Sequence, residues 1–121
     1  MSKHIMVVDD SKTMRDMIAF TLTGAGYQVS QAEDGQAGLV ALGALKVDAV
    51  ITDLNMPKLD GIGLIKALRA DARFKATPIL MLTTESDPAK KTQGRDAGAT
   101  GWIVKPFAPE KLVETLKKVG L

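Results

Sequence analysis

The chain contains no cysteine, and this absence excludes several classes of protein. Without thiols there can be no disulfide framework, no thiolate metal site and no cysteine nucleophile. Long apolar runs are also lacking, because no uninterrupted stretch reaches the length that spans a bilayer. The amino end, residues 1–5, leads directly into a predicted strand and does not have the pattern of a signal peptide. We therefore expect a cytoplasmic protein that does not enter the membrane.

An excess of charge of one sign is missing as well. The formal net charge is +2, and the lysines and arginines are scattered along the chain. Binding to nucleic acid usually requires a concentrated basic face. No helix-turn-helix pattern follows the last predicted helix, which ends near Leu121, so we do not expect a DNA-binding regulator. Linkers, low-complexity segments and internal repeats are absent, and 121 residues predict a single domain over residues 1–121.

Along the chain, segments with the pattern of strands alternate with segments whose apolar residues recur at helical spacing. The predicted strands are Ile5–Val8, Tyr27–Gln31, Asp48–Thr52, Pro78–Leu82 and Trp102–Val104. The predicted helices are Thr13–Thr23, Gly35–Leu45, Gly61–Ala70, Pro88–Ala97 and Pro109–Val119. Strands that alternate with helices through short connections predict an α/β fold, a doubly wound parallel sheet with right-handed crossovers.

The helix predicted at Pro88–Ala97 is the most polar in the chain. Its faces carry Lys90, Lys91 and Arg95, and few apolar residues anchor it. A weakly anchored helix is a candidate for movement or for binding a partner. The alternative is an ordinary solvated surface helix, and the pattern alone does not separate the two.

Polar or charged side chains end four of the predicted strands. They are Asp9 and Asp10 after the first strand, Asp53 after the third, Thr83 and Thr84 after the fourth, and Lys105 after the fifth. Parallel strands place these ends at one edge of the sheet, where open α/β sheets bind their ligands. Each residue also has a simpler interpretation: Asp10 or Ser11 can cap a helix, and the others can be ordinary loop or surface groups. Their conjunction favours a site.

The chemistry of such a cluster follows from its charges. Carboxylates that are brought together repel one another unless a cation neutralises them. Oxygen ligands without histidine or cysteine favour a hard ion, Mg²⁺ before Ca²⁺. A carboxylate beside Mg²⁺ can attack phosphorus and form an aspartyl-phosphate, and a lysine and a threonine would help to neutralise and position the phosphoryl group. These residues predict phosphoryl transfer to Asp53.

The residues named above lie in four short motifs, and these motifs occur together in a known protein family. They are Val7-Val8-Asp9-Asp10-Ser11, Asp53-Leu54-Asn55-Met56-Pro57-Lys58-Leu59-Asp60-Gly61, Leu82-Thr83-Thr84 and Val104-Lys105-Pro106-Phe107. Together they resemble the receiver domains of two-component response regulators over the whole chain. The segment 98–107 is similar to that of the single-domain chemotaxis regulators in this family. The resemblance implies a flavodoxin-like (βα)5 fold with strand order 2-1-3-4-5, an order that the patterns do not establish.

The resemblance also implies a role for each acidic residue. Asp53 would accept a phosphoryl group from a phosphohistidine of a histidine kinase of the CheA type. Asp10 would bind Mg²⁺ directly, Asp9 would hold it largely through water, and Asn55 would contribute its backbone carbonyl. Asn55 and Glu85 stand at positions that tune dephosphorylation in the family, and they imply a short-lived phosphoryl group.

The remaining implied roles concern the response to phosphorylation. Lys105 would pair with a phosphoryl oxygen, and the Lys105–Pro106 bond would be cis, which is a proline phenomenon. Thr83 would move to donate a hydrogen bond to the phosphoryl group, and Trp102 would be the switch aromatic that follows it. Trp102 is larger than the usual Tyr or Phe, and the alternative is an aromatic side chain packed at a sheet edge.

The implied function is a stand-alone regulator, a monomer that signals rather than a true enzyme. Its output partner would be the flagellar switch protein FliM or another protein. Lys91 and Arg95 stand where a motor-binding regulator has smaller or more apolar residues, so a phosphate sink or relay intermediate is the alternative. A haloacid-dehalogenase-like phosphatase is a more distant one, because those enzymes carry an Asp-x-Asp pair on the first strand rather than adjacent Asp9 and Asp10.

Overall fold

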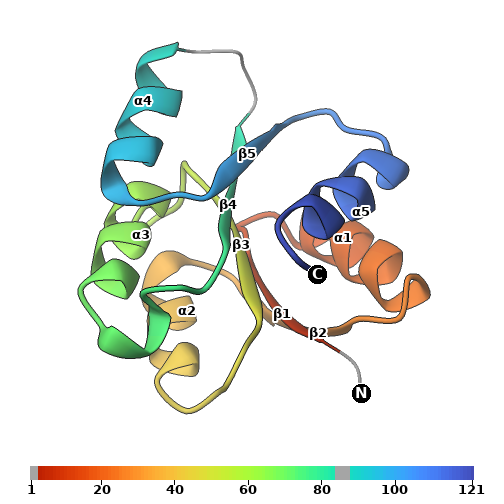
Figure 1. The fold of residues 1–121 in the computed structure, drawn as a ribbon, viewed down its shortest axis with the longest axis horizontal. Coiled ribbons are helices and arrows are strands. Elements are labelled where there is room, and N and C mark those ends of the chain that lie inside the picture. The colour runs from red at the N-terminus through yellow and green to blue at the C-terminus, as the bar shows by residue number, and fades with distance from the viewer. Residues whose placement is uncertain (1–2, 84–87) are drawn as a thin grey trace.

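The computed structural model describes residues 3–83 and 88–121, and its centre is one parallel sheet. The strands lie in the order β2-β1-β3-β4-β5 (Figure 1). Their bounds are β1 His4–Val8, β2 Gln28–Ala32, β3 Ala49–Asp53, β4 Ile79–Thr83 and β5 Gly101–Val104. The predicted doubly wound sheet, and the flavodoxin-like order that the resemblance implies for a single domain, are both confirmed.

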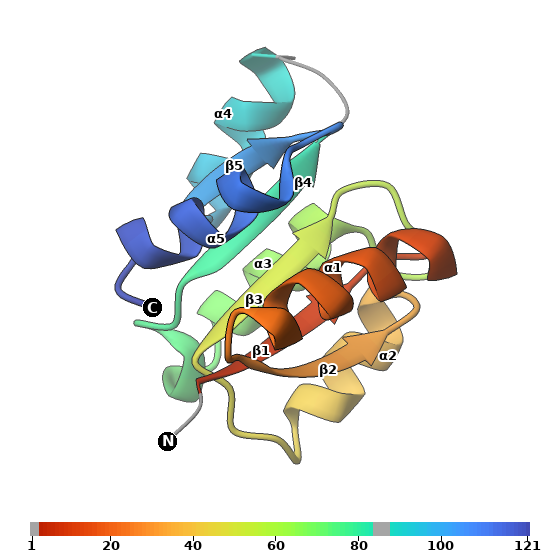
Figure 2. The ribbon, with the colours of Figure 1, turned by 90° about the vertical axis from the view of Figure 1, so that its right-hand side faces the viewer.

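Helices cover both faces of the sheet. They are α1 Lys12–Gly24, α2 Gly35–Leu42, α3 Gly61–Arg69, α4 Pro88–Ala97 and α5 Pro109–Lys118, with a short 3₁₀ helix η1 at Ala72–Phe74. Helices α1 and α5 lie on one face, and α2, α3 and α4 lie on the other (Figures 1 and 2). Proline in the first turn of α5 starts that helix as expected, because its fixed φ suits the position.

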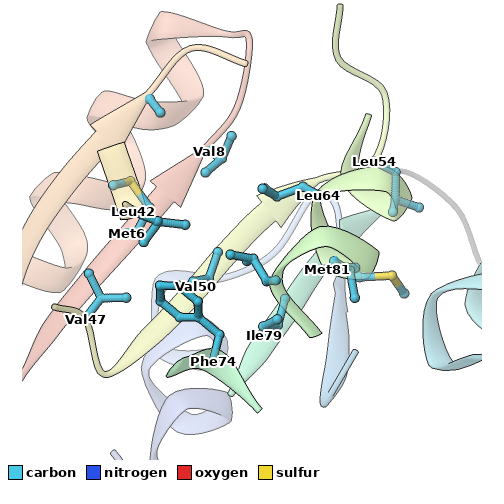
Figure 3. Close-up of a cluster of buried hydrophobic side chains, with 13 residues drawn as sticks. Met6, Val8, Leu42, Val47, Val50, Leu54, Leu64, Phe74, Ile79 and Met81 are labelled. Carbon is cyan, nitrogen blue, oxygen red and sulfur yellow. The ribbon is translucent and has the colours of Figure 1, made fainter. Parts of the chain in front are cut away.

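The two layers of core follow from the alternation of side chains along each strand. In β1, Ile5 and Val7 point to the face covered by α1 and α5, whereas Met6 and Val8 point to the opposite face. Figure 3 shows the second layer, in which strand residues pack against Leu42, Leu64 and other helix side chains. The central strands β3 and β4 are buried throughout, which agrees with their continuous apolar sequences.

Apart from shifts of one residue at the ends of several strands and helices, two details differ from the predictions. Helix α2 ends at Leu42 rather than Leu45, because Gly43 caps it and the chain continues in turns. Leu45 nevertheless packs against the core, which explains why its spacing resembled helix. The second detail is η1, which the sequence reading missed. It follows the cap residue Asp71 and buries Phe74, and so short a segment carries no periodic signal.

The register of the sheet aligns the strand ends that the sequence singled out. Val8 pairs with Thr52, Asp53 pairs with Leu82, and Thr83 pairs with Val104. Asp9, Asp53, Thr83 and Lys105 therefore emerge at the same edge.

Helix α4 is anchored weakly, as its composition predicts. Of its ten residues Gly94 alone is buried, and it lies directly over Met81 of β4. Whether α4 moves or binds a partner stays a prediction. Over the described ranges, none of the helices has the length and apolar character needed to cross a membrane.

Candidate functional site

Three carboxylates meet at the carboxyl edge of the sheet. Asp9, Asp10 and Asp53 each offer an oxygen atom, and these atoms all lie within 4.8 Å of one another. Asp9 and Asp53 are buried, whereas Asp10 is exposed and faces solvent at the mouth of the cluster. Such closeness of acids is unfavourable unless positive charge lies nearby.

Asp9 is held from several directions. One carboxylate oxygen accepts the Ser11 N–H at 2.9 Å, and the other lies 3.2 Å from Lys105 Nζ. The Asp9 carbonyl accepts a hydrogen bond of 2.6 Å from the Arg15 guanidinium, which also donates to Gln31. Ser11, not Asp10, caps α1, since its hydroxyl accepts the Met14 N–H. Asp10 is therefore not used as the cap.

Arg15 was missed by the sequence reading. It lies in the first turns of α1, and its guanidinium joins Asp9, the residue after β1, to Gln31 of β2. The only feature of the sequence that could have indicated Arg15 is its spacing, four residues after Ser11, which places the two side chains on the same face of a helix.

Asp53 and Lys105 form a second ion pair at the site. Lys105 Nζ lies 3.3 Å from Asp53 Oδ1, and the same oxygen accepts the Leu54 N–H at 2.9 Å. Burial raises the pKa of the Asp53 carboxyl above its usual value, the Lys105 ammonium lowers that pKa, and the Asp9 carboxylate raises it. Without a further cation, the ionised form of Asp53 is therefore disfavoured in the folded protein.

The loop after Asp53 turns sharply to reach α3. Asn55 is exposed within it, and Lys58 adopts a left-handed conformation with φ of 68°. Gly61 lies against the Asp53 carbonyl: an added Cβ would lie 2.2 Å from that oxygen, so a side chain does not fit. The sequence contained Gly61 in a motif, but only the packing explains it.

Thr83 and Lys105 are joined through the backbone of neighbouring strand ends. The Lys105 N–H donates to the Thr83 carbonyl at 2.6 Å, and Thr83 is buried at the end of β4. The Lys105–Pro106 bond, which the resemblance implies to be cis, has that geometry.

Trp102 lies on β5, on the outer side of the molecule. The residue is 37% exposed, and the Lys91 ammonium lies over its ring, 5.1 Å from the ring centroid. Trp102, Pro106, Phe107 and Lys111 line a shallow groove between β5 and the start of α5. Glu85 and Thr84 lie outside the described residues.

The donor set fits magnesium. It consists of clustered carboxylate oxygens, two of them from buried side chains, and it contains no histidine or cysteine. Hard oxygen donors of this kind are the usual ligands of Mg²⁺. The Lys105 ammonium occupies one side of the cluster, at 3.2 and 3.3 Å from Asp9 and Asp53. Asp10 is the exposed member of the three acids, so an ion could reach the cluster from solvent on its side.

Comparisons with known proteins agree with this geometry. The family model of the response regulator receiver domain matches residues 5–117. The chain is 44% identical to the chemotaxis protein CheY1 of Helicobacter pylori over 95% of this chain and 94% of that protein. It is 39% identical to CheY of Pseudomonas aeruginosa over the same shares of the two chains.

Solved structures lead to the same family. The chemotaxis response regulator CheY4 of Vibrio cholerae superposes with a TM-score of 0.95 at 46% identity, covering 98% of this chain and 99% of that one. The receiver domain of a sensor histidine kinase from Pseudomonas aeruginosa, which holds a magnesium ion in its active-site cleft, gives a TM-score of 0.92 at 25% identity, with full coverage of both chains. This chain therefore belongs to the family of response regulator receiver domains, and it is CheY-like.

Proposed function

We propose that this protein is a stand-alone, cytoplasmic response regulator of a chemotaxis phosphorelay, and that Asp53 is its phosphoacceptor. The observation that supports this most directly is the cluster of Asp9, Asp10 and Asp53 with Lys105 at one edge of the sheet. Asp53 is the acid at the end of the central strand β3, and its Oδ1 atom is bound by both Lys105 Nζ and the Leu54 N–H. A nucleophile needs such fixed orientation.

The donor would be a phosphohistidine on a histidine kinase of the CheA type. A P–O bond forms to the Asp53 carboxylate as the P–N bond breaks, and its electron pair remains on the imidazole nitrogen. Bound magnesium would neutralise charge on the carboxylates and on the phosphoryl oxygens. Asp9, Asp10, Asp53 and the Asn55 carbonyl would hold it. Lys105 would then move its pairing from the carboxylates to a phosphoryl oxygen.

The output would be a change at the surface formed by α4, β5 and α5. Thr83 would donate a hydrogen bond to the phosphoryl group, and Trp102 would follow it from its half-exposed position. Phosphorylation would favour one of two conformers rather than create a new one. The groove beside Trp102 and the weakly anchored α4 support this choice of surface. The partner would be the flagellar switch protein FliM or another output protein, bound by a monomer of this chain.

Exposure to acetyl phosphate and Mg²⁺ tests the assignment of Asp53. The wild-type protein should gain one phosphoryl group, measured by intact mass, and Asp53→Asn should gain none. Asp48→Asn is the matched control, because Asp48 lies just before the other end of β3 and an amide oxygen can still accept the His4 N–H. Full labelling of Asp53→Asn would refute the proposal.

A pull-down with and without beryllofluoride, which mimics a phosphoryl group, tests the output. Capture of purified FliM only in its presence would place the protein at the motor. Phosphorylation without any such capture would support the role of a phosphate sink or relay intermediate.

A further inference from the structure

We infer that the start of α2, Asp34 and Gly35, positions the loop of residues 54–60 and through it the magnesium site. Neither residue belongs to the cluster of acids. Both lie at the start of the crossover helix α2, which connects β2 to β3, the strand that ends at Asp53. The inference rests on the proposed function, because it concerns the same metal site. It assigns a positioning role to residues at the start of α2, although the loop that they position leads from β3 into α3.

Gly35 makes the closest contact. An added Cβ at Gly35 would lie 2.1 Å from the Leu59 carbonyl oxygen and 2.8 Å from the Leu59 carbonyl carbon. These are backbone atoms, so no rotation of a side chain could relieve the overlap. Gly35 is buried, and α2 therefore begins in direct contact with the main chain of the loop.

Asp34 adds a second contact with the loop. The Asp34 side chain is buried, and one carboxylate oxygen accepts the Ala37 N–H at 2.7 Å, which caps α2. The other oxygen lies 3.8 Å from Lys58 Nζ. Lys58 is the residue with positive φ, a conformation that needs support from its surroundings in a non-glycine residue. The Gly35 contact thus holds Leu59, and the long ion pair adds a weaker link to the adjacent residue, Lys58, whose side chain is mostly exposed.

The opposite end of the loop is fixed by α3. The Gly61 N–H donates to the Leu54 carbonyl at 2.9 Å, and Gly61 lies against the carbonyl of Asp53. Asn55, whose carbonyl would bind the metal, lies between these two supports. A shift of Leu59 away from α2 would therefore displace the segment that carries Asn55.

Magnesium titration by calorimetry measures this effect directly. Gly35→Ala should weaken Mg²⁺ binding by about tenfold, the lower end of what the loss of a group that orients metal ligands costs. Gly24→Ala is the matched control, because a Cβ there would meet nothing within 4 Å. Unfolding of each variant by urea in EDTA separates positioning from stability. An unchanged Mg²⁺ dissociation constant in folded Gly35→Ala would overturn the inference, even if stability fell.

A measurement on the wild-type protein covers the case in which Gly35→Ala does not fold. Coupling between two sites is reciprocal, so Mg²⁺ should also slow hydrogen exchange at the Ala37 amide, which Asp34 caps. The Leu112 amide, at the start of α5, provides the internal reference. Equal effects of Mg²⁺ on both amides would overturn the inference.

These outcomes remain distinct from those of the proposed function. If the wild-type protein bound no Mg²⁺, the proposed metal site itself would be wrong. If the wild-type protein bound Mg²⁺ and neither Gly35→Ala nor the Ala37 amide responded, only the role of α2 would be wrong.

Discussion

Lys105 Nζ lies 3.3 Å from Asp53 Oδ1, although their strands are separated by β4. The lysine side chain reaches across the end of β4, and its ammonium also stands 3.2 Å from Asp9. One partly buried cation therefore balances two buried carboxylates at the site. The electrostatic consequences of this arrangement can be measured without any phosphodonor.

Asp53→Asn should stabilise the protein in EDTA near neutral pH. The pKa of Asp53 is raised in the folded state, chiefly by burial, so its contribution to stability is fully present below the usual value of 3.8. That contribution is lost as pH rises through the raised pKa, because the ionised form is disfavoured in the folded protein. Asparagine resembles the protonated carboxyl, so we expect the variant to have a higher free energy of unfolding than the wild type at neutral pH.

Urea unfolding as a function of pH checks this prediction. The gain should shrink as the pH falls and should vanish below 3.8, where the wild-type carboxyl is also protonated. A variant that is less stable than the wild type at neutral pH would contradict it.

Lys105→Met should destabilise the protein in EDTA by about 3 kcal/mol, because it leaves buried carboxylates without their partner. Saturating Mg²⁺ should recover more stability in this variant than in the wild type, since an added cation then replaces the missing charge. Thermal unfolding with and without Mg²⁺ measures both effects. Lys118→Met is the control: Lys118 forms an exposed pair with Glu114, and its loss should cost no more than about 0.5 kcal/mol. Equal losses in the two variants would argue against a buried pair.

Gly94→Ala should destabilise the protein by about 1–3 kcal/mol, the usual cost of overpacking. A Cβ at Gly94 would lie 2.0 Å from the Met81 sulfur, so α4 or Met81 must shift. Helix propensity alone predicts the opposite sign, a gain of about 1 kcal/mol. Urea unfolding decides between them.

The Met81→Ala background tests the cause of this cost. With the methionine truncated, Gly94→Ala should cost much less, and the two substitutions should be strongly non-additive. Additive effects would show that α4 and β4 do not meet through this pair.

Trp102 should respond to the phosphoryl mimic. It is the single tryptophan of the chain and is 37% exposed, so intrinsic fluorescence reports its environment alone. Adding Mg²⁺ and beryllofluoride should shift its emission to shorter wavelength, because the ring would leave water for an apolar setting. Thr83→Ala should lose this shift. Lys91→Ala should change the starting emission, since the ammonium lies over the ring, but should keep the shift. A wild-type protein that binds the mimic without any shift would contradict the switch role of Trp102.

Much of the fold was predictable from the sequence, because local patterns specify strands and helices directly. The continuous apolar segments of β3 and β4 indicated strands buried on both faces, and both are buried throughout. The polar composition of α4 likewise indicated weak anchoring, and Gly94 is its one buried residue. Boundaries were less predictable: α2 stops at Leu42, because Gly43 ends the helix before the apolar spacing ends.

The sequence by itself also determined that Asp9, Asp53, Thr83 and Lys105 share one edge, since parallel strands align their carboxyl ends. Tertiary structure alone decided the strand order, which depends on how the crossovers pack rather than on any local pattern. It also decided that Lys105 pairs with both Asp9 and Asp53, and that Gly35 meets the backbone of Leu59. Those contacts join residues far apart in the chain, and their distances follow from the packing of whole helices on the sheet.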